Sequence, residues 1–277
     1  MFVKKKIDYY PITIVLLLFA IDIVVFLLSP SILLTILWST IGLYLKGAIC
    51  CWNHNHQHNN FFTVAWANRL LELVLGLQTG IVGEAWVLHH TRGHHLNYLD
   101  QTKDESAWMA PDGRTMARLE YTFKVTSTAY PMAFQVGKKH PKSRNKLIQN
   151  LLATAIVLGV FMAINWINTL ILFVVPMLIL LTMTINTTYD HHSGLDTENP
   201  YEATYNITNR WYNLLTCNLG YHTAHHLQCS RHWSQLPQYH EEIKDRIPAH
   251  LYREAGFPFN VLEKIEQNWF KKAQQSM

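Results

Sequence analysis

The chain is poor in charged residues and in cysteines. Only 15% of its 277 residues are charged, whereas 49% are hydrophobic. Soluble domains carry about 25% charged residues, so the composition disfavours a soluble protein and indicates a membrane protein. Its four cysteines form no C-x-x-C pair, which argues against a cysteine-based zinc site or a thioredoxin-type motif. We therefore expect free thiols and no disulfide.

Features typical of several other protein classes are also missing. The net charge of +4 is modest, and no basic-aromatic pattern or known nucleic-acid-binding motif occurs. The sequence has no internal repeat and no low-complexity tail. We expect no nucleic-acid partner and interpret residues 1–277 as a single domain.

Long apolar runs occur in two pairs. Each run is close to the roughly 20 residues that a helix needs to cross a bilayer. Ser29-Pro30-Ser31 forms a turn inside the first pair, and Asn165 and Asn168 mark a turn inside the second. No small-residue cleavage site follows the first run, so we expect it to be retained rather than removed as a signal peptide. The sequence predicts an all-α membrane protein with two transmembrane hairpins, spanning about 11–28, 32–51, 150–167 and 170–187.

Basic residues predict the orientation of these hairpins. Lys4 to Lys6 precede the first run, and a basic segment over 138–146 precedes the third. Basic flanks of membrane spans stay in the cytoplasm. The two termini and the polar segments 52–149 and 188–277 are then all cytoplasmic, where we expect them to form a helical cap. The basic segment could also attract a phosphate-bearing or acidic acyl carrier, or anionic lipid.

The predicted cap is rich in histidines. They cluster as H-x-x-x-H, H-x-x-x-H-H, D-H-H and H-x-x-H-H, each beside an apolar run. Residues three and four apart share one helix face, so a cluster can direct several imidazoles at one point. Four clusters supply about the number of nitrogens that two metal ions need. The candidate ligands are His54, His58, His90, His94, His95, His191, His192, His222, His225 and His226.

The number of histidines narrows the type of metal site. Imidazole suits iron, zinc and copper alike, but a catalytic zinc needs only three protein ligands. Soluble carboxylate di-iron bundles use glutamates with paired E-x-x-H motifs, and no such pair occurs here. The residues themselves thus favour a multinuclear, histidine-rich site without fixing the metal.

The three boxes resemble those of integral-membrane fatty acid desaturases and hydroxylases. They read H54-N-H-Q-H58, H90-T-R-G-H94-H95 and H222-T-A-H225-H226, with D-H191-H192-S-G between the second and third. The resemblance covers about residues 11–240. It implies four spans, a cytoplasmic di-iron site and oxidation of an unactivated acyl C–H bond with dioxygen. It also implies an external electron donor such as a ferredoxin, because the chain has no haem module and no cysteine set for an iron–sulfur centre.

The resemblance leaves several assignments open. His56 and His89 adjoin the boxes but are expected to lie outside the ligand set. Of His191 and His192 one is expected to bind metal, and we prefer His191 because a glycine follows it by three residues. Asp190 could orient a neighbouring imidazole. A similar role could fall to three carboxylates that we instead expect in a solvated loop, namely Asp100, Asp104 and Glu105.

The reaction and substrate are also open at this stage. We expect desaturation of a fatty acid, acyl lipid or acyl thioester carried on coenzyme A or acyl carrier protein. The alternatives are acyl hydroxylation, alkyne formation, oxidation of a carotenoid and, outside enzymes, metal transport. Transporters place polar ligands near the middle of their spans, whereas these clusters follow the ends of the runs.

Two charged residues inside the first hairpin carry a separate prediction. Asp22 and Lys46 lie within the apolar runs, where charged groups usually face protein or a cavity. In an antiparallel hairpin the two side chains can lie at similar depths. The sequence therefore allows an ion pair between them.

Overall fold

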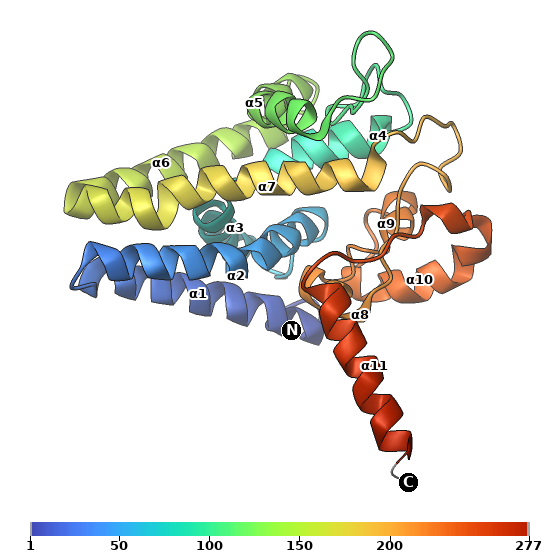
Figure 1. Ribbon diagram of the computed structural model, residues 1–277. Coiled ribbons are helices and arrows are strands. Elements are labelled where there is room, and N and C mark those ends of the chain that lie inside the picture. Colours follow the sequence, from blue (N-terminus) through green and yellow to red (C-terminus); the bar gives the residue numbers. More distant parts are fainter. Residues whose placement is uncertain (1, 276–277) are drawn as a thin grey trace. The chain divides into compact units, whose positions relative to one another are not determined.

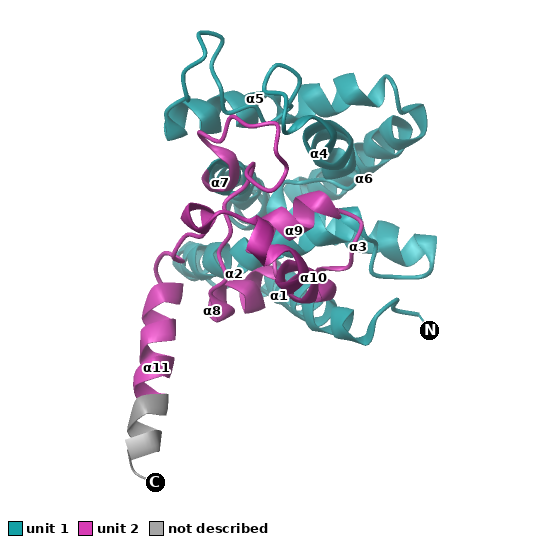
Figure 2. Ribbon diagram, turned by 90° about the vertical axis from the view of Figure 1, so that its right-hand side faces the viewer, with its two compact units in different colours: residues 1–189 teal, residues 190–277 magenta. Residues whose placement is uncertain are grey.

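The computed structural model describes residues 2–275, and their side chains up to residue 269. Helices make up the fold, and within these residues the only β structure is a set of isolated bridges. The chain divides into two compact units, which comprise residues 1–189 and 190–277 (Figure 2).

The first unit contains the membrane-length helices and several shorter ones (Figure 1). They are α1 (Tyr9–Leu28), α2 (Ile32–His58), α3 (Ala65–Thr79), the π-helix η2 (Val87–His94), α4 (His95–Asn97), α5 (Arg118–Gly137), α6 (Pro141–Thr169), the π-helical η3 (Leu170–Val174) and α7 (Val175–His192). The second unit begins in the last turn of α7. It continues with α8 (Arg210–Thr216), α9 (His222–Leu227), α10 (Leu236–Ile243) and α11 (Phe259–Gln275).

The first predicted hairpin is present as α1 and α2, which run antiparallel (Figure 1). Ser31 caps α2, because its hydroxyl accepts a hydrogen bond from the Leu34 amide at 3.3 Å. The predicted ion pair also forms, with 2.7 Å between Lys46 Nζ and Asp22 Oδ2. The Trp38 indole donates to the other carboxylate oxygen at 2.9 Å. Both charges are buried, so the pair lets two ionised groups sit between apolar helices.

The second predicted pair of spans lies within the residues of α6, η3 and α7, which follow one another directly. Asn165, near the end of α6, has non-helical dihedral angles (φ −154°, ψ 92°). The chain reverses direction there between α6 and α7 (Figure 1). Three stretches are long and apolar enough to cross a membrane, namely Lys6–Leu28, Ile32–His58 and Pro141–His192. The third contains both later predicted spans, so the count of four crossings stays a prediction.

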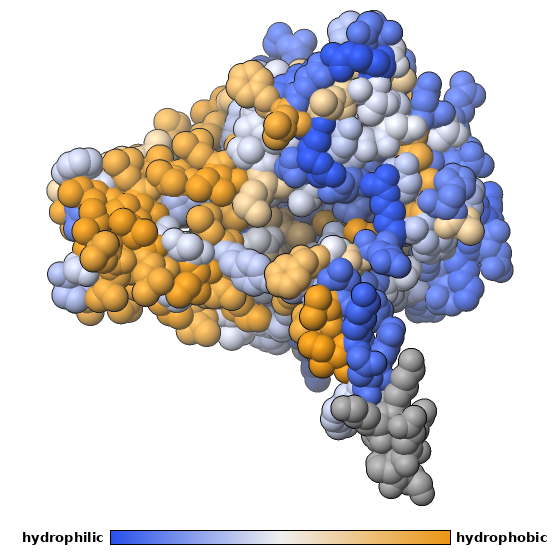
Figure 3. Space-filling model, viewed as in Figure 1, coloured by the Kyte–Doolittle hydropathy of each residue, from blue (hydrophilic) through white to orange (hydrophobic). Residues whose placement is uncertain are grey.

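Apolar side chains face outward along these helices. Leu28 and Leu33, beside the α1–α2 turn, are 73% and 74% exposed. Figure 3 shows the apolar surface gathered over α1, α2, α6 and α7. Such a large exposed apolar surface is unfavourable in water and is the surface that lipid would cover. The chain is therefore a membrane protein.

The segment between the hairpins is helical, and it is not among the stretches long and apolar enough to cross a membrane. Its helix α3 ends at Gly80, which adopts φ +73°. A Cβ added there would lie 2.2 Å from the Met177 carbonyl oxygen. Glycine therefore both ends α3 and lets α7 pass close to it.

The helices also extend past the predicted limits of the spans. Helix α2 continues to His58, beyond the predicted end at residue 51, and α6 begins at Pro141 rather than near residue 150. The first histidine box therefore lies on the last turns of a long apolar helix.

The second unit has its own core beneath short helices. Ala224 of α9 and Leu236 and Ile243 of α10 pack with Ile247 and Leu251. A parallel bridge joins Asn206 to Tyr252. This core fixes α9, which carries the third histidine box.

Candidate metal centre

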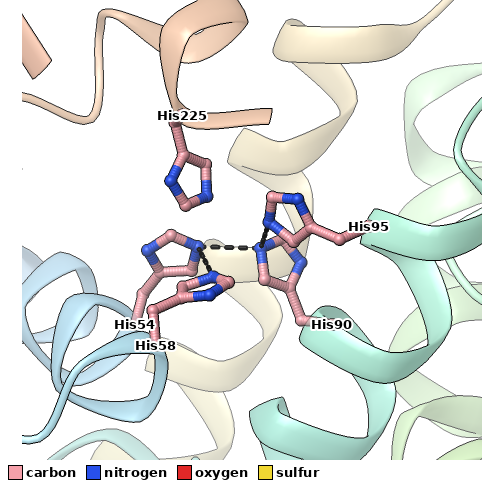
Figure 4. Close-up of side chains that lie close together, drawn as sticks. All are labelled: His54, His58, His90, His95 and His225. Atoms are coloured by element: carbon pink, nitrogen blue, oxygen red, sulfur yellow. Dashed lines mark hydrogen bonds between the residues drawn. The ribbon is translucent and has the colours of Figure 1, made fainter. Parts of the chain in front are cut away.

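Four histidines of the first unit direct their imidazoles at one point. His54 and His58 come from the end of α2, His90 from η2 and His95 from α4 (Figure 4). Their ring nitrogens lie within 4.8 Å of one another. The His54 Nε2 atom is 2.8 Å from Nε2 of His90 and 3.3 Å from Nε2 of His58. The His95 and His90 Nε2 atoms are 3.0 Å apart.

These separations fit ligands of a shared ion. Two nitrogens about 2.1 Å from one metal are about 3.0 Å apart at a right angle and about 3.4 Å apart at the tetrahedral angle. The three Nε2–Nε2 distances of 2.8, 3.0 and 3.3 Å fall close to this range. The donor set of neutral imidazoles is one that iron accepts. The residues present therefore fit a metal ion.

The π-helical segment explains how His90 and His95 converge. In an α-helix, residues five apart point about 140° away from each other. Residues 87–94 instead form a π-helix, whose hydrogen bonds connect i with i+5. His90 and His95 therefore share one side, whereas the sequence spacing predicts His90 with His94. Single π turns of this kind are frequent at functional sites.

His94 is held by a carboxylate from the following loop. Its Nδ1 donates to Asp104 Oδ1 at 2.8 Å, and both side chains are buried. Asp104 also accepts from the Ser106 amide at 2.8 Å. A histidine that donates Nδ1–H to a carboxylate presents Nε2 to a metal and becomes a stronger donor. The expectation that Asp104 belongs to a solvated loop is therefore wrong.

The other two carboxylates of this loop behave differently. Asp100 is exposed and pairs with Lys103, as expected of a solvated loop. Glu105 accepts from the Asn97 side chain at 3.4 Å, and burial raises the pKa of its carboxyl group. Of the three acidic residues in this loop, only Asp104 thus forms a hydrogen bond with His94.

The second unit gathers the later histidines by itself. Nε2 of His192 lies 3.0 Å from Nε2 of His222, again a separation that suits two ligands of one ion. The ring centre of His226 is 4.7 Å from those of both His192 and His222. His225 follows on the same short helix, with its ring centre 5.6 Å from that of His222.

The geometry favours His192 over His191 as the ligand. His192 Nδ1 donates to the Ala203 carbonyl at 3.1 Å, which leaves Nε2 directed at His222. His191 instead stacks on the His222 ring at 4.1 Å, with its Nδ1 3.4 Å from the Tyr205 carbonyl oxygen. The proposed ligand is therefore His192 rather than the preferred His191. The backbone carbonyl of Asp190 accepts a hydrogen bond from Arg253 at 2.9 Å. That the Asp190 side chain orients a neighbouring imidazole stays a prediction.

Gly220 allows the third box to reach this position. A Cβ at residue 220 would lie 2.1 Å from the Ile207 carbonyl oxygen and 2.7 Å from Asn213 Oδ1. The Gly220 amide donates to that same Asn213 oxygen at 3.1 Å. Glycine therefore permits the close backbone approach that places His222 at the start of α9.

The histidines that adjoin the boxes have ordinary packing roles. His56 is buried away from the cluster, and its Nδ1 accepts from the Phe61 amide at 3.2 Å. His89 stacks on Trp86 with ring centres 5.6 Å apart. Further along the chain, His232 Nδ1 accepts from the Ser234 amide and His240 lies 3.3 Å from the Tyr252 hydroxyl.

Burial keeps the His90 imidazole neutral. The pKa of His90 lies well below its usual range, because burial and the neighbouring histidines disfavour the charged form. Burial likewise lowers the pKa of His89 to about 4. A neutral ring offers a free nitrogen at physiological pH, so His90 need not release a proton before it binds a metal.

Comparison with known proteins agrees with this chemistry. The model of the fatty acid desaturase family matches residues 30–257, a range that contains every proposed ligand. No curated protein and no solved structure matches the chain. The matched range covers most of the sequence, including all three histidine boxes and the D-H-H motif. The chain therefore belongs to the fatty acid desaturase family, whose members are oxidoreductases.

Proposed function

We propose that this protein is a membrane iron oxidase that desaturates an acyl chain with dioxygen and external electrons. The observation that carries the proposal is the convergence of four imidazoles, three buried and one half-buried, beside the end of the long apolar helix α2. The Nε2 atoms of His54 and His90 are only 2.8 Å apart. Family membership supplies the reaction class. Desaturation removes two hydrogens from the chain, and dioxygen with two further electrons and two protons becomes two waters.

Two iron ions are the proposed cofactor. The proposed iron ligands of the first unit are His54, His58, His90, His94 and His95. Those of the second unit are His192, His222, His225 and His226. Bound iron supplies dioxygen activation, which no amino-acid side chain can provide. His191 remains the alternative to His192.

The chain's own contribution is to orient the ligands and keep them neutral. Asp104 fixes the His94 ring, and the Ala203 carbonyl fixes that of His192. Thr91 Oγ1 lies 3.3 Å from His58 Nδ1 and can accept a hydrogen bond from its N–H. Each contact leaves Nε2 as the metal-binding atom. No separate acid–base residue is part of this proposal.

The proposed topology has four crossings in two hairpins. The α1–α2 pair provides the first hairpin, and the reversal at Asn165 divides the Pro141–His192 stretch into the second. Lys4 to Lys6 and the basic segment 138–146 favour cytoplasmic placement of both termini and of the metal-binding histidines.

The proposed partners are a ferredoxin-like or similar small electron donor and an acyl substrate. The acyl group could be carried by coenzyme A, acyl carrier protein or a membrane lipid. An acidic carrier would complement the exposed lysines Lys138, Lys139 and Lys142, which lie around the start of α6.

Mass spectrometry of acyl lipids from an expressing bacterium tests the reaction. Wild-type protein is compared with His90→Ala, and with His56→Gln as a buried histidine outside the cluster. We expect the acyl chains to lose two hydrogens each with the wild-type protein and with His56→Gln, but not with His90→Ala. Loss of four hydrogens indicates alkyne formation, and gain of one oxygen indicates hydroxylation. Oxidised carotenoid in a pigment-producing host, or iron uptake by vesicles without acyl products, would contradict the proposal.

A further inference from the structure

The last helix of the second unit presents an apolar face outward. Val261, Ile265 and Trp269 are four residues apart along α11 and therefore share one side of the helix. They are 42%, 59% and 67% exposed, and Phe257 just before the helix is 81% exposed. Figure 3 shows apolar surface along one side of α11 and hydrophilic surface along the other.

The polar side of α11 holds the helix to α8. The Asn209 side chain donates to Glu263 at 2.9 Å, and Arg210 forms an ion pair with Glu266. The Tyr212 and Phe259 rings meet at the base of the helix, with their centres 5.4 Å apart. A helix of a water-soluble domain packs its apolar face inward. Here the orientation is the reverse, so the apolar face is available to an apolar environment.

The charges of α11 complement an anionic surface. Its only acidic residues are Glu263 and Glu266, and both are engaged by α8. Lys264 is exposed and lies next to the apolar side, and Lys271 and Lys272 follow in the sequence. Positive charge beside an apolar stripe that includes a tryptophan is typical of helices at the membrane surface.

We propose that α11 lies in the headgroup region of the bilayer, with Val261, Ile265 and Trp269 inserted among the acyl chains. The partner is the lipid surface itself. An interfacial helix of this kind typically buries its apolar side about 5–10 Å into the boundary between headgroups and chains. Through α8 it would tie the unit that carries the third histidine box to the membrane surface.

Spin labels on the full chain can test this location. The protein is reconstituted into vesicles of phosphatidylcholine and phosphatidylglycerol, after labelling of Val261→Cys, Ile265→Cys or Gln267→Cys. Gln267 is exposed on another side of α11 and is the matched control. The parent chain, labelled in the same way, gives the background from its own cysteines. Each label is then probed with oxygen, which concentrates in lipid, and with a water-soluble nickel complex.

The proposal predicts that labels at 261 and 265 collide more with oxygen and less with nickel than the label at 267. Equal access of nickel to all three positions would place α11 in water and overturn it. Shielding of 261 and 265 from both probes would indicate a protein contact, such as a second copy of the chain, and would also overturn it. The readout does not depend on enzyme activity.

Discussion

Asp104 Oδ1 lies 2.8 Å from Nδ1 of His94, and both side chains are buried. This contact fixes the ring orientation of a proposed iron ligand from a loop ten residues further along the chain. It gives the polar segment after the second histidine box a specific task in the metal centre.

Asp104→Asn is expected to weaken metal binding. The amide lacks the negative charge that favours an N–H donor and a more basic Nε2 on His94. Loss of such a partner typically costs 10–100-fold in metal affinity or activity. Iron content and acyl product are measured together. Asp100→Asn is the matched control, because Asp100 is exposed and pairs only within its loop; an equal loss in both variants would contradict the assigned role.

Gly220→Ala is expected to displace the third histidine box. The new methyl group would overlap the Ile207 carbonyl oxygen, only 2.1 Å away. Overpacking of this kind typically costs about 1–3 kcal/mol, so the melting temperature and the iron content should both fall. Gly256→Ala, where a Cβ meets nothing within 4 Å, should leave both unchanged. Wild-type behaviour of Gly220→Ala would show that the close approach does not constrain the box.

The Asp22–Lys46 pair is expected to stabilise the α1–α2 hairpin as a unit. Removal of one partner leaves an unpaired buried charge, which typically costs about 3–5 kcal/mol in protein interiors. Asp22→Leu and Lys46→Met should each lower the melting temperature in detergent, and the double variant should recover most of that loss. A double-mutant cycle measures the coupling. Additive losses in the double variant would show that the pair contributes no coupling energy.

His240 is expected to make the second unit acid-sensitive. Burial lowers the pKa of its imidazole in the folded protein, whereas the unfolded value is about 6.5. Below that pH the unfolded state binds more protons, so the free energy of unfolding falls as the pH drops. His240→Gln should melt with a smaller difference between pH 7.5 and pH 5.5 than wild type. An unchanged difference would assign the acid sensitivity to other groups.

The sequence predicts the fold well where long apolar runs occur. Two apolar runs around Ser29-Pro30-Ser31 predict the α1–α2 hairpin, because helices joined by so short a turn lie antiparallel. The antiparallel arrangement in turn places Asp22 and Lys46 at similar depths. Helix ends are less accessible to sequence. Helix α2 continues through polar residues to His58, since tertiary packing supports helix where composition alone suggests a loop.

The histidine boxes identify the ligand candidates, but not their partners. H-x-x-x-H on α2 and H-x-x-H-H on α9 follow ordinary helical spacing. The second box departs from it, because a π-helix brings His90 to His95 instead of His94. Nothing in the local sequence predicts that change of pitch. The burial of Asp104, which we expected in a solvated loop, is unpredictable for a related reason, since it depends on how an irregular loop folds back.

The most direct test of the account is the metal content of the purified chain, measured by elemental mass spectrometry on anaerobically prepared protein. Two irons per chain are expected, with a large loss in His90→Ala and in His222→Ala and none in His56→Gln. This result would show that both groups of histidines hold the metal. Zinc in place of iron, or full iron in His90→Ala and His222→Ala, would contradict the proposed centre.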